Sequence, residues 1–212
     1  MTGFQGPAHE CALCPRLVAF RDQNAASYPD FHNGPVASFG SLDAGVLVVG
    51  LAPGLKGANR TGRPFTGDGA GDLLYPALIA GGFAAGTYDR RADDGLELID
   101  CRITNAVRCV PPQNKVTGSE AATCRPFLID EISAMPNLRF LLALGRVAHE
   151  AILRTFDLRL KDHAFGHGAM HRLPNGLVMA DSFHCSRYNV NTGRLTPEMF
   201  GQVLTTIRQS LA

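Results

Sequence analysis

Short apolar runs recur along the chain, each followed by glycine or by a polar loop. Their length and their content of valine, leucine and isoleucine are those of buried strands. The runs are 46–51, 96–106, 139–144 and a hairpin-like pair at 170–173 and 177–180. Pro174, Asn175 and Gly176 form the turn of this pair, which leads into a polar segment at 182–194.

Between these runs, apolar residues recur three and four positions apart, which is the spacing of an amphipathic helix. Asp68 precedes the first long helix and can cap it with its carboxylate, and Thr117 or Ser119 can cap the next. Near the C-terminal end, Thr196 and Pro197 are typical of a helix start. The predicted helices are a short one ending near residue 26, then 70–79, a helix from 117 or 119 to about 135, 146–155, and the residues after 196.

The alternation of strands and helices predicts an α/β fold in which a parallel sheet is covered on both faces. A length of 212 residues is enough to bury one sizeable core. The sequence contains no repeat, linker or low-complexity segment. We therefore expect a single domain over residues 1–212.

The bulk composition is that of an ordinary globular protein, with 45% hydrophobic and 18% charged residues. No apolar run approaches the roughly 20 residues that a membrane-spanning helix needs. The first residues have neither the basic nor the apolar segment of a signal peptide, so we expect a cytoplasmic protein without a membrane partner. The net charge of +1 gives no general reason to expect a nucleic-acid partner.

Arginine is used far more than lysine, with 17 residues against 3. A GC-rich genome would favour arginine codons and explains this ratio equally well. It does not explain why Arg60, Arg63, Arg187 and Arg194 lie within glycine-rich motifs. Because guanidinium groups bind phosphate through paired hydrogen bonds, these four positions suggest an anionic ligand.

Polar and aromatic side chains follow three of the predicted strands. The loop 50–68 comes after the first strand, contains five glycines and two prolines, and carries Phe65 and Asp68. Asn105 lies near the end of the second strand, and His184 follows the last. Because parallel strands end at one edge of a sheet, we expect these side chains to converge there.

This set of side chains suits a flat heterocycle that stacks on Phe65 and pairs with the amide of Asn105, within a rim of arginines for a phosphodiester backbone. Structural explanations remain open for each residue. Phe65 can fix the loop to the core, Asp68 can act only as a helix cap, and Asn105 can satisfy buried backbone groups. The sequence has no Ser-His-Asp order, Walker lysine or dinucleotide fingerprint.

The six cysteines of a cytosolic protein are expected to be metal ligands, reactive thiols or core residues rather than disulfides. Cys11 and Cys14 form a C-x2-C pair, and Cys109 and Cys124 are separated by 14 intervening residues. Four thiolates from two places can hold zinc or an iron–sulfur cluster, and the prolines after Cys14 and Cys109 favour a metal. Buried or redox-active cysteines are the alternative. Cys101 has apolar neighbours and is expected in the core.

His163, His167 and His171 have the i, i+4 spacing of metal ligands on a helix. Gly166 and Gly168 argue against a helix at this position. We therefore expect solvated or hydrogen-bonded loop histidines here rather than a second metal site.

Several motifs, in this order along the chain, are those of one protein family. They are 50–54, the run Asn-Arg-Thr-Gly-Arg-Pro-Phe-Thr-Gly-Asp at 59–68, Ile-Thr-Asn at 103–105 leading to Cys109-x-Pro-Pro, Cys124-Arg125-Pro126, His184-x-Ser186, and Thr-Gly-Arg-Leu-Thr at 192–196. On these motifs, which extend over nearly the whole chain, the sequence resembles the iron–sulfur uracil-DNA glycosylases, most closely the family 5, or type b, branch.

The resemblance implies a three-layer αβα sandwich with a central, mainly parallel four-stranded sheet. It also implies a structural 4Fe-4S cluster on Cys11, Cys14, Cys109 and Cys124, which ties the N-terminal segment into the domain. The implied activity is that of a monomeric, monofunctional DNA repair glycosylase. Such an enzyme flips a deaminated base (uracil, and also hypoxanthine or xanthine) out of double- or single-stranded DNA and hydrolyses its glycosidic bond.

Three residues would be catalytic under this interpretation. Asn105 would pair with the edge of a base that is stacked on Phe65. His184 would donate a hydrogen bond to the negative charge that develops on the base. Asp68 would stabilise the cationic sugar or orient the attacking water.

Further residues would bind the substrate. They are Gly50, Leu51, Arg60, Arg63, Arg187 and Tyr188. The backbone N–H groups of the first two would hold a base carbonyl. The last two lie on the loop after His184 and would enter the gap left by the flipped base.

Two positions depart from the family pattern. Ala52 stands where related branches have an acid or amide, so water activation cannot be assigned there. Cys185 replaces the usual proline of a His-Pro-Ser turn, which keeps the turn but loses the fixed φ, and ligation by its thiol is a minor alternative. Two other functions are considered. Lys56 suggests a variant in which the enzyme is a Schiff-base lyase, although a lone loop lysine is usually solvated. The competing hypothesis is a zinc- or iron–sulfur-stabilised nucleic-acid-binding module without catalysis.

Overall fold

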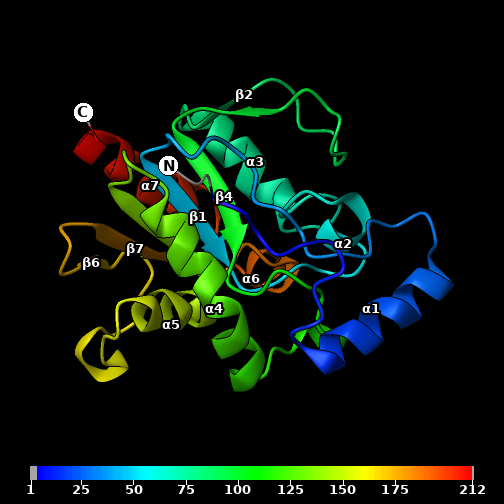
Figure 1. Ribbon diagram of the computed structural model, residues 1–212. Helices are drawn as coiled ribbons and strands as arrows, with labels where there is room; N and C mark the ends of the chain where they lie inside the picture. Colours follow the sequence, from blue (N-terminus) through cyan, green and yellow to red (C-terminus); the bar gives the residue numbers. More distant parts are fainter. Residues whose placement is uncertain (1–3, 212) are drawn as a thin grey trace.

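The computed structural model describes residues 4–211, and a twisted sheet lies at its centre (Figure 1). This sheet has five strands in the order β4-β1-β5-β7-β6. The strands are β1 (Val46–Gly50), β4 (Cys101–Asn105), β5 (Phe140–Leu144), β6 (Met170–Arg172) and β7 (Val178–Ser182), and β2 (Ala84–Ala85) pairs with β3 (Glu97–Leu98) in a separate two-stranded sheet. β1 is parallel to β4 and β5, and β7 is parallel to β5, whereas β6 is antiparallel to β7.

The predicted α/β fold with a mainly parallel sheet is confirmed, but the sheet contains five strands instead of four. The additional strand is β6, the first half of the predicted hairpin, which pairs with β7 from Met170 opposite Ala180 to Arg172 opposite Val178. Gly176 has a φ of +86° in the connecting turn, a conformation that glycine adopts without steric cost. A short hairpin strand therefore extends the parallel sheet at its edge.

The second predicted strand, 96–106, is interrupted in the middle. Its first part is β3, which pairs with β2, and β4 begins only at Cys101. Asp100 causes the interruption because it has a left-handed φ of +51°, and its carboxylate accepts the Gly45 N–H at 2.5 Å. The chain enters the central sheet only after this turn.

Helices connect the strands. They are α1 (Pro15–Ser27), α2 (Ala58–Thr61), α3 (Gly71–Ala80), α4 (Gly118–Ser133), α5 (Arg146–Thr155), α6 (Arg187–Asn191) and α7 (Pro197–Leu211), with 3-10 turns η1 (Pro112–Asn114) and η2 (Leu160–Asp162). The five predicted helices are present as α1, α3, α4, α5 and α7, and the short helices α2 and α6 were not predicted. Thr117 caps α4, since its hydroxyl accepts the Glu120 N–H while the Glu120 carboxylate accepts the Thr117 N–H. Asp68 is not the cap of α3, which follows Ala70. Within residues 4–211, no helix has both the length and the apolar character needed to cross a bilayer.

Side chains alternate along β1 and divide the core into two layers. Val46 and Val48 pack with α3 and α7, whereas Leu47 and Val49 pack with α4 and α5. Figure 1 shows these helix pairs on opposite faces of the sheet, so the architecture is the three-layer αβα sandwich.

The carboxyl ends of the parallel strands lie at one edge. Gly50 at the end of β1 pairs with Asn105 at the end of β4, and Leu144 at the end of β5 pairs with Ser182 at the end of β7. The loops that follow these four strands therefore start side by side.

Candidate active site

A cavity of about 530 Å³ opens at this edge of the sheet. Its walls come from the loops after β1, β4, β5 and β7. The predicted site residues that line it are Leu51, Phe65, Asp68, Asn105, His184 and Arg187. Side chains from three distant segments of the sequence therefore face one space.

Gly50 allows the aromatic ring and the amide to approach the end of β1. A Cβ atom at position 50 would lie 2.5 Å from Cζ of Phe65 and would also collide with Oδ1 of Asn105. Phe65 itself has a φ of +53°, which costs energy for a residue with a large side chain. The surrounding structure must therefore hold the Phe65 loop in this conformation.

Asp68 is held against the glycine-rich loop. Its Oδ1 accepts the Ala70 N–H at 3.1 Å. Its Oδ2 lies on the other side, where a Cβ at Gly54 would be 2.8 Å away and a Cβ at Gly57 would overlap the same oxygen. Glycine at both positions makes room for a carboxylate at the cavity wall, a requirement that the sequence analysis did not identify.

His184 lies across the cavity from Asp68 and beside the aromatic ring. The ring centroids of His184 and Phe65 are 6.0 Å apart. Burial lowers the pKa of His184 below its ordinary value of 6.5, while Asp68 opposes this change. The carbonyl of His184 accepts an N–H from the Asn189 side chain at 2.8 Å, which fixes the loop that carries it. The lowered pKa favours the neutral imidazole at neutral pH.

The residues after His184 form the rim of the cavity. Ser186 caps the short helix α6 by accepting the Asn189 N–H. Arg187, the first residue of α6, lines the cavity and lies against Gly69, where a Cβ would approach its Nε to 2.5 Å. Tyr188 is 72% exposed and stands outside the cavity wall. A cation and an exposed aromatic ring thus border the opening.

Arg60 and Arg63, in the loop after β1, were both expected to bind the substrate, but only Arg60 is exposed. Arg60 is exposed, and its Nε donates to the Lys56 carbonyl at 3.0 Å. Arg63 is buried with Asp94, and two of its nitrogens donate to the two carboxylate oxygens at 2.8 Å each. The predicted role of Arg63 in substrate binding does not fit this placement, because its charge is already paired inside the protein.

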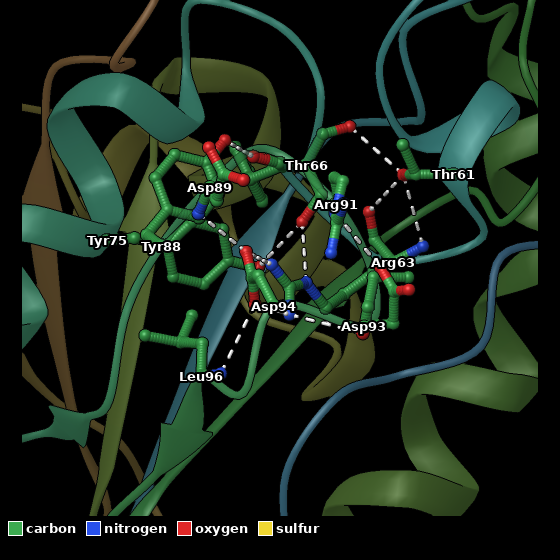
Figure 2. A network of polar contacts seen from close by, with 12 residues as sticks. Thr61, Arg63, Thr66, Tyr75, Tyr88, Asp89, Arg91, Asp93, Asp94 and Leu96 are labelled. Atoms are coloured by element: carbon green, nitrogen blue, oxygen red, sulfur yellow. Dashed lines mark hydrogen bonds and ion pairs between the residues drawn. The ribbon is translucent and has the colours of Figure 1, made fainter.

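Figure 2 shows the polar network around this ion pair. Nε of Arg63 donates to Oγ1 of Thr66 at 2.8 Å, and its guanidinium lies over the Tyr75 ring at 5.3 Å. The Asp94 carboxylate also accepts the backbone N–H groups of Asp89 and Leu96. The network joins the residues on both sides of Phe65 to the segment before β3, and so holds the strained loop in place.

The cavity also has walls that the sequence analysis did not predict. They are formed by Pro111, Asn114 and the run Leu144, Gly145, Arg146 and Val147. Gly145 has a φ of +93°, and a Cβ there would lie 3.2 Å from that of His184. The predicted strand 139–144 ends at the same edge of the sheet, so its end could have indicated this wall. It was not used because no polar cluster follows that strand.

The four cysteines of the predicted cluster line a second, small apolar pocket together with Leu17 and Phe127. Cys14 precedes α1, Cys124 lies in α4, and Cys109 follows β4. Burial, together with the neighbouring thiols of Cys124 and Cys11, raises the pKa of the Cys109 thiol to about 12. Thiolates in such surroundings require a compensating cation, so the residues present fit an iron–sulfur cluster or a metal ion.

The remaining candidate residues lie away from both sites. Cys101 and Cys185 are buried in the core layer formed with α3 and α7. Burial raises the pKa of Cys185 to about 12, and its side chain does not line the four-cysteine pocket. Lys56 does not line the cavity, whose described walls contain no lysine.

The histidine series at 163–171 is not helical. Nδ1 of His167 accepts the Phe183 N–H at 3.2 Å, and its Nε2 lies 3.3 Å from the Met199 carbonyl. His171 lies in β6, and its Nε2 is 3.0 Å from Asp181. His167 and His171 are therefore hydrogen-bonded and outside a helix, but His171 lies in a strand and not in the expected loop, and Nε2 of His163 has no hydrogen-bond partner among residues 4–211.

Comparison with known proteins agrees with this arrangement. The family model described as "Uracil DNA glycosylase superfamily" matches residues 37–208. The type-5 uracil-DNA glycosylase of Thermus thermophilus is 46% identical over 199 residues, which cover 92% of this chain and 90% of that protein. The type-5 enzyme of Pyrobaculum aerophilum is 41% identical over 198 residues, covering 92% and 86%. The type-4 enzyme of the same organism is 33% identical over 130 residues, covering 61% and 58%.

Fold and cavity define an α/β protein with a site for a flat, polar ligand at the carboxyl edge of its sheet. The family match extends over both the sheet and the loops that build the site. The chain belongs to the uracil-DNA glycosylase superfamily. Within it, the similarity to the type-5 enzymes extends over nine-tenths of the chain, and that to the type-4 enzyme over three-fifths.

Proposed function

We propose that the protein is a uracil-DNA glycosylase of DNA repair, which hydrolyses the N-glycosidic bond of deaminated bases and leaves an abasic site. Family membership supports uracil as a substrate. We extend the proposal to hypoxanthine and xanthine on the resemblance to the family 5 branch, in which an alanine such as Ala52 stands in place of an acid or amide. The observation that carries the proposal is the convergence of Asp68, Asn105 and His184 on one cavity beside Phe65.

The base must leave the duplex before it can react, because the glycosidic bond is inaccessible inside the stack. A cavity of about 530 Å³ is large enough for a single nucleotide. Phe65 supplies the stacking surface, and the buried amide of Asn105 pairs with the polar edge of the base. The backbone N–H of Leu51, which follows β1, binds a base carbonyl in this proposal, whereas Gly50 is the last residue of β1 and is paired with Asn105 of β4.

His184 acts on the leaving base. As the glycosidic bond lengthens, the base gains negative charge and the sugar gains positive charge. The neutral imidazole donates an N–H to that negative charge, an electrostatic contribution of about 3–4 kcal/mol for a well-placed donor. Burial favours the neutral form of His184 and also strengthens the hydrogen bond, since little water competes for it.

Asp68 acts on the sugar side of the bond. Its carboxylate faces the cavity across from His184, so it stabilises the cationic sugar or orients the water that attacks it. Ala52 contributes no polar group, which leaves Asp68 as the carboxylate of the described cavity wall. After bond cleavage the sugar gains the water oxygen, and the base leaves with the proton.

The four-cysteine pocket holds a 4Fe-4S cluster in this proposal, with Cys11, Cys14, Cys109 and Cys124 as ligands. When bound, the cluster cross-links α1, α4 and the loop after β4, and takes no part in the reaction. The apolar walls around the four thiols support a structural role, because they exclude water from the ligands.

DNA binds across the opening of the cavity. Arg187 neutralises a phosphate near the flipped nucleotide, and Tyr188 enters the gap that the base leaves in the stack. Arg60 is exposed and binds a more distant phosphate. We propose that the enzyme acts as a monomer in the cytoplasm, on duplex and single-stranded DNA.

The test is incubation with end-labelled DNA containing uracil, hypoxanthine or xanthine, in duplex and single-stranded form, followed by alkali. Strand breaks that appear only after alkali are expected, because a monofunctional glycosylase leaves the backbone intact. Breaks without alkali would indicate the lyase variant, in which Lys56 forms a Schiff base. If no lesion is cut but the DNA is bound, the protein is a non-catalytic nucleic-acid-binding module and the proposal is wrong.

A further inference from the structure

Three polar side chains meet on the sheet away from the cavity. They are His149 in α5, His171 in β6 and Asp181 in β7. Nδ1 of His149 is 2.8 Å from Oδ1 of Asp181, and Nε2 of His171 is 3.0 Å from Oδ2. The side chains of His149 and Asp181 are 2% and 0% exposed, and that of His171 is 13% exposed. One ligand atom from each residue lies within 4.8 Å of the other two.

Both ring nitrogens of His149 face oxygen atoms. Nδ1 lies 2.8 Å from Oδ1 of Asp181, and Nε2 lies 3.0 Å from the His163 carbonyl. Nδ1 is therefore the nitrogen that faces Asp181 within the cluster.

Partners outside the cluster orient two of these three groups. Nε2–H of His149 donates to the His163 carbonyl, and Oδ2 of Asp181 also accepts the Gly166 N–H at 3.3 Å. The rings of His149 and Phe165 pack edge to face with centroids 5.6 Å apart. Backbone partners of this kind, which hold the non-ligating atoms of each group, are a feature of protein metal sites.

A second observation comes from His163, whose ring stacks on that of His171 at 5.8 Å. Its Nε2 is buried and has no hydrogen-bond partner among residues 4–211. Buried nitrogens of this kind are rare, because an unsatisfied polar atom costs about 1–3 kcal/mol. A water molecule bound to a metal ion at the cluster would supply the missing partner.

We propose that His149 Nδ1, His171 Nε2 and Asp181 bind a zinc-type divalent cation, with water at the fourth position. Two imidazoles and one carboxylate are ligands that zinc accepts in tetrahedral geometry, at about 2.0–2.2 Å. Ligand atoms at these distances are about 3.3 Å apart, so the two observed contacts need to open by about 0.3–0.5 Å.

The site joins three elements, of which α5 packs on β7 through the core cluster of Ala148, Ile152 and Met179, and β6 pairs with β7 at the sheet edge. β6 is a three-residue edge strand, and the cation would fix it to α5 and β7. β7 ends two residues before His184, so the site supports the strand that carries the catalytic loop. The proposal concerns stability and does not depend on the proposed glycosylase activity.

The experiment is calorimetric titration of the cluster-loaded, full-length protein with zinc chloride. We expect one zinc ion per chain, with iron absorbance unchanged. In His171→Asn, whose amide can still donate to Asp181, we expect zinc affinity to fall at least about tenfold. His9→Asn, a matched change at an exposed histidine outside the cluster, should leave the affinity unchanged.

Thermal unfolding gives an independent measurement, since a ligand that binds only the folded state raises its midpoint. Zinc should raise the midpoint of the wild-type protein, and magnesium should not. The wild-type stoichiometry remains decisive even if His171→Asn folds poorly. No zinc bound to the cluster-loaded wild type, equal zinc affinity in wild type and His171→Asn, or zinc uptake only with loss of iron would overturn the proposal and leave a hydrogen-bonded cluster.

Discussion

At the scale of single residues, the candidate site depends on close approaches that only particular side chains permit. Gly50 admits the ring of Phe65, and Gly54 and Gly57 admit the carboxylate of Asp68. The electrostatic state of His184 is set by two opposing influences, burial and the Asp68 carboxylate. Each of these relations can be tested by a single substitution.

Asp68→Asn should lower the pKa of His184. Burial already holds this pKa below 6.5, and the Asp68 carboxylate is the group that raises it. Removing that negative charge leaves burial unopposed, so protonation of the ring moves to lower pH. The measurement is an NMR titration of the labelled His184 ring in both proteins. An unchanged or higher pKa in the variant would mean that the two side chains do not interact.

The same pKa predicts a pH dependence of activity. The neutral imidazole donates to the leaving base, so base release should persist as pH falls to 6.5 and decline only below it, at the lowered pKa of His184. His184→Ala should reduce the rate of base release by about 10²–10³-fold without weakening DNA binding. Single-turnover rates across this pH range test both statements, and an acidic limb above pH 6.5 would contradict the first.

Gly57→Ala should impair catalysis through Asp68. The added methyl group overlaps the position of Asp68 Oδ2 and displaces the carboxylate from the cavity wall. We expect a loss in the rate of base release similar to that in Asp68→Ala. In the double variant the losses should not add, since both changes remove the same group. Gly118→Ala is the matched control, because a Cβ there meets no atom within 4 Å. Additive losses would show that Gly57 affects catalysis independently of Asp68.

At the scale of elements, the Phe65 loop is held by a buried ion pair. Arg63 and Asp94 have side chains that are 5% and 1% exposed. Burial alone would raise the pKa of Asp94, but hydrogen bonds from Arg63 and two backbone N–H groups hold it well below its ordinary value. A carboxyl of this kind stabilises the fold above the pKa of the unfolded state, about 3.9, and this contribution is lost as pH falls through the folded pKa.

Arg63→Ala should destabilise the protein by about 3–5 kcal/mol, because it leaves the Asp94 charge buried without its partner. Urea unfolding measures this loss, and the exposed Arg60→Ala is the matched control with little change. DNA binding separates the two arginines in the opposite sense. Arg60→Ala should lower the magnitude of the slope of log K for DNA binding against log salt concentration by about 0.9, which corresponds to one lost phosphate contact. Arg63→Ala should leave this slope unchanged. A stable Arg63→Ala protein with weaker salt dependence would restore the predicted role of Arg63 in DNA binding.

Elements with a local signal were predictable from the sequence. The strand at 46–51 is continuous and apolar, and the Thr117–Glu120 capping box marks the start of α4 within four residues. The interruption at Asp100 depends on a contact with Gly45 that no local pattern indicates. The same holds for Arg63, whose partner lies 31 residues away in sequence.

At the scale of the whole molecule, the parallel topology explains both the successes and the failures of prediction for the site. The meeting of Asp68, Asn105 and His184 followed from strand ends that must share one edge. The same rule applied to β5 would have indicated the wall at 144–147, which carries little polar chemistry. The His149–Asp181 pair joins a helix to a strand 32 residues later and had no signal in the histidine spacing.

The four-cysteine pocket connects the N-terminal segment to the cavity. Cys11 and Cys14 both lie just before α1. Cys109 lies two residues before Pro111, which lines the cavity. A change at the cluster should therefore loosen both α1 and one wall of the site. Arg16 also joins α1 to α4 by two hydrogen bonds to the Glu120 carboxylate, but this pair is partly exposed and is expected to contribute little by itself.

Cys124→Ser should abolish iron binding and release the N-terminal segment while the central sheet stays folded. Cys124 lies in α4 and the loop of Cys109 precedes the cavity wall, so hydrogen exchange should accelerate over residues 11–27 and 107–116 but not in β1 or β5. DNA affinity should fall more than the rate of base release, since Asp68 and His184 are held by other contacts. Arg16→Ala should keep its iron and change exchange only near α1. Unchanged exchange after loss of iron would show that the cysteines do not bind the N-terminal segment to the domain.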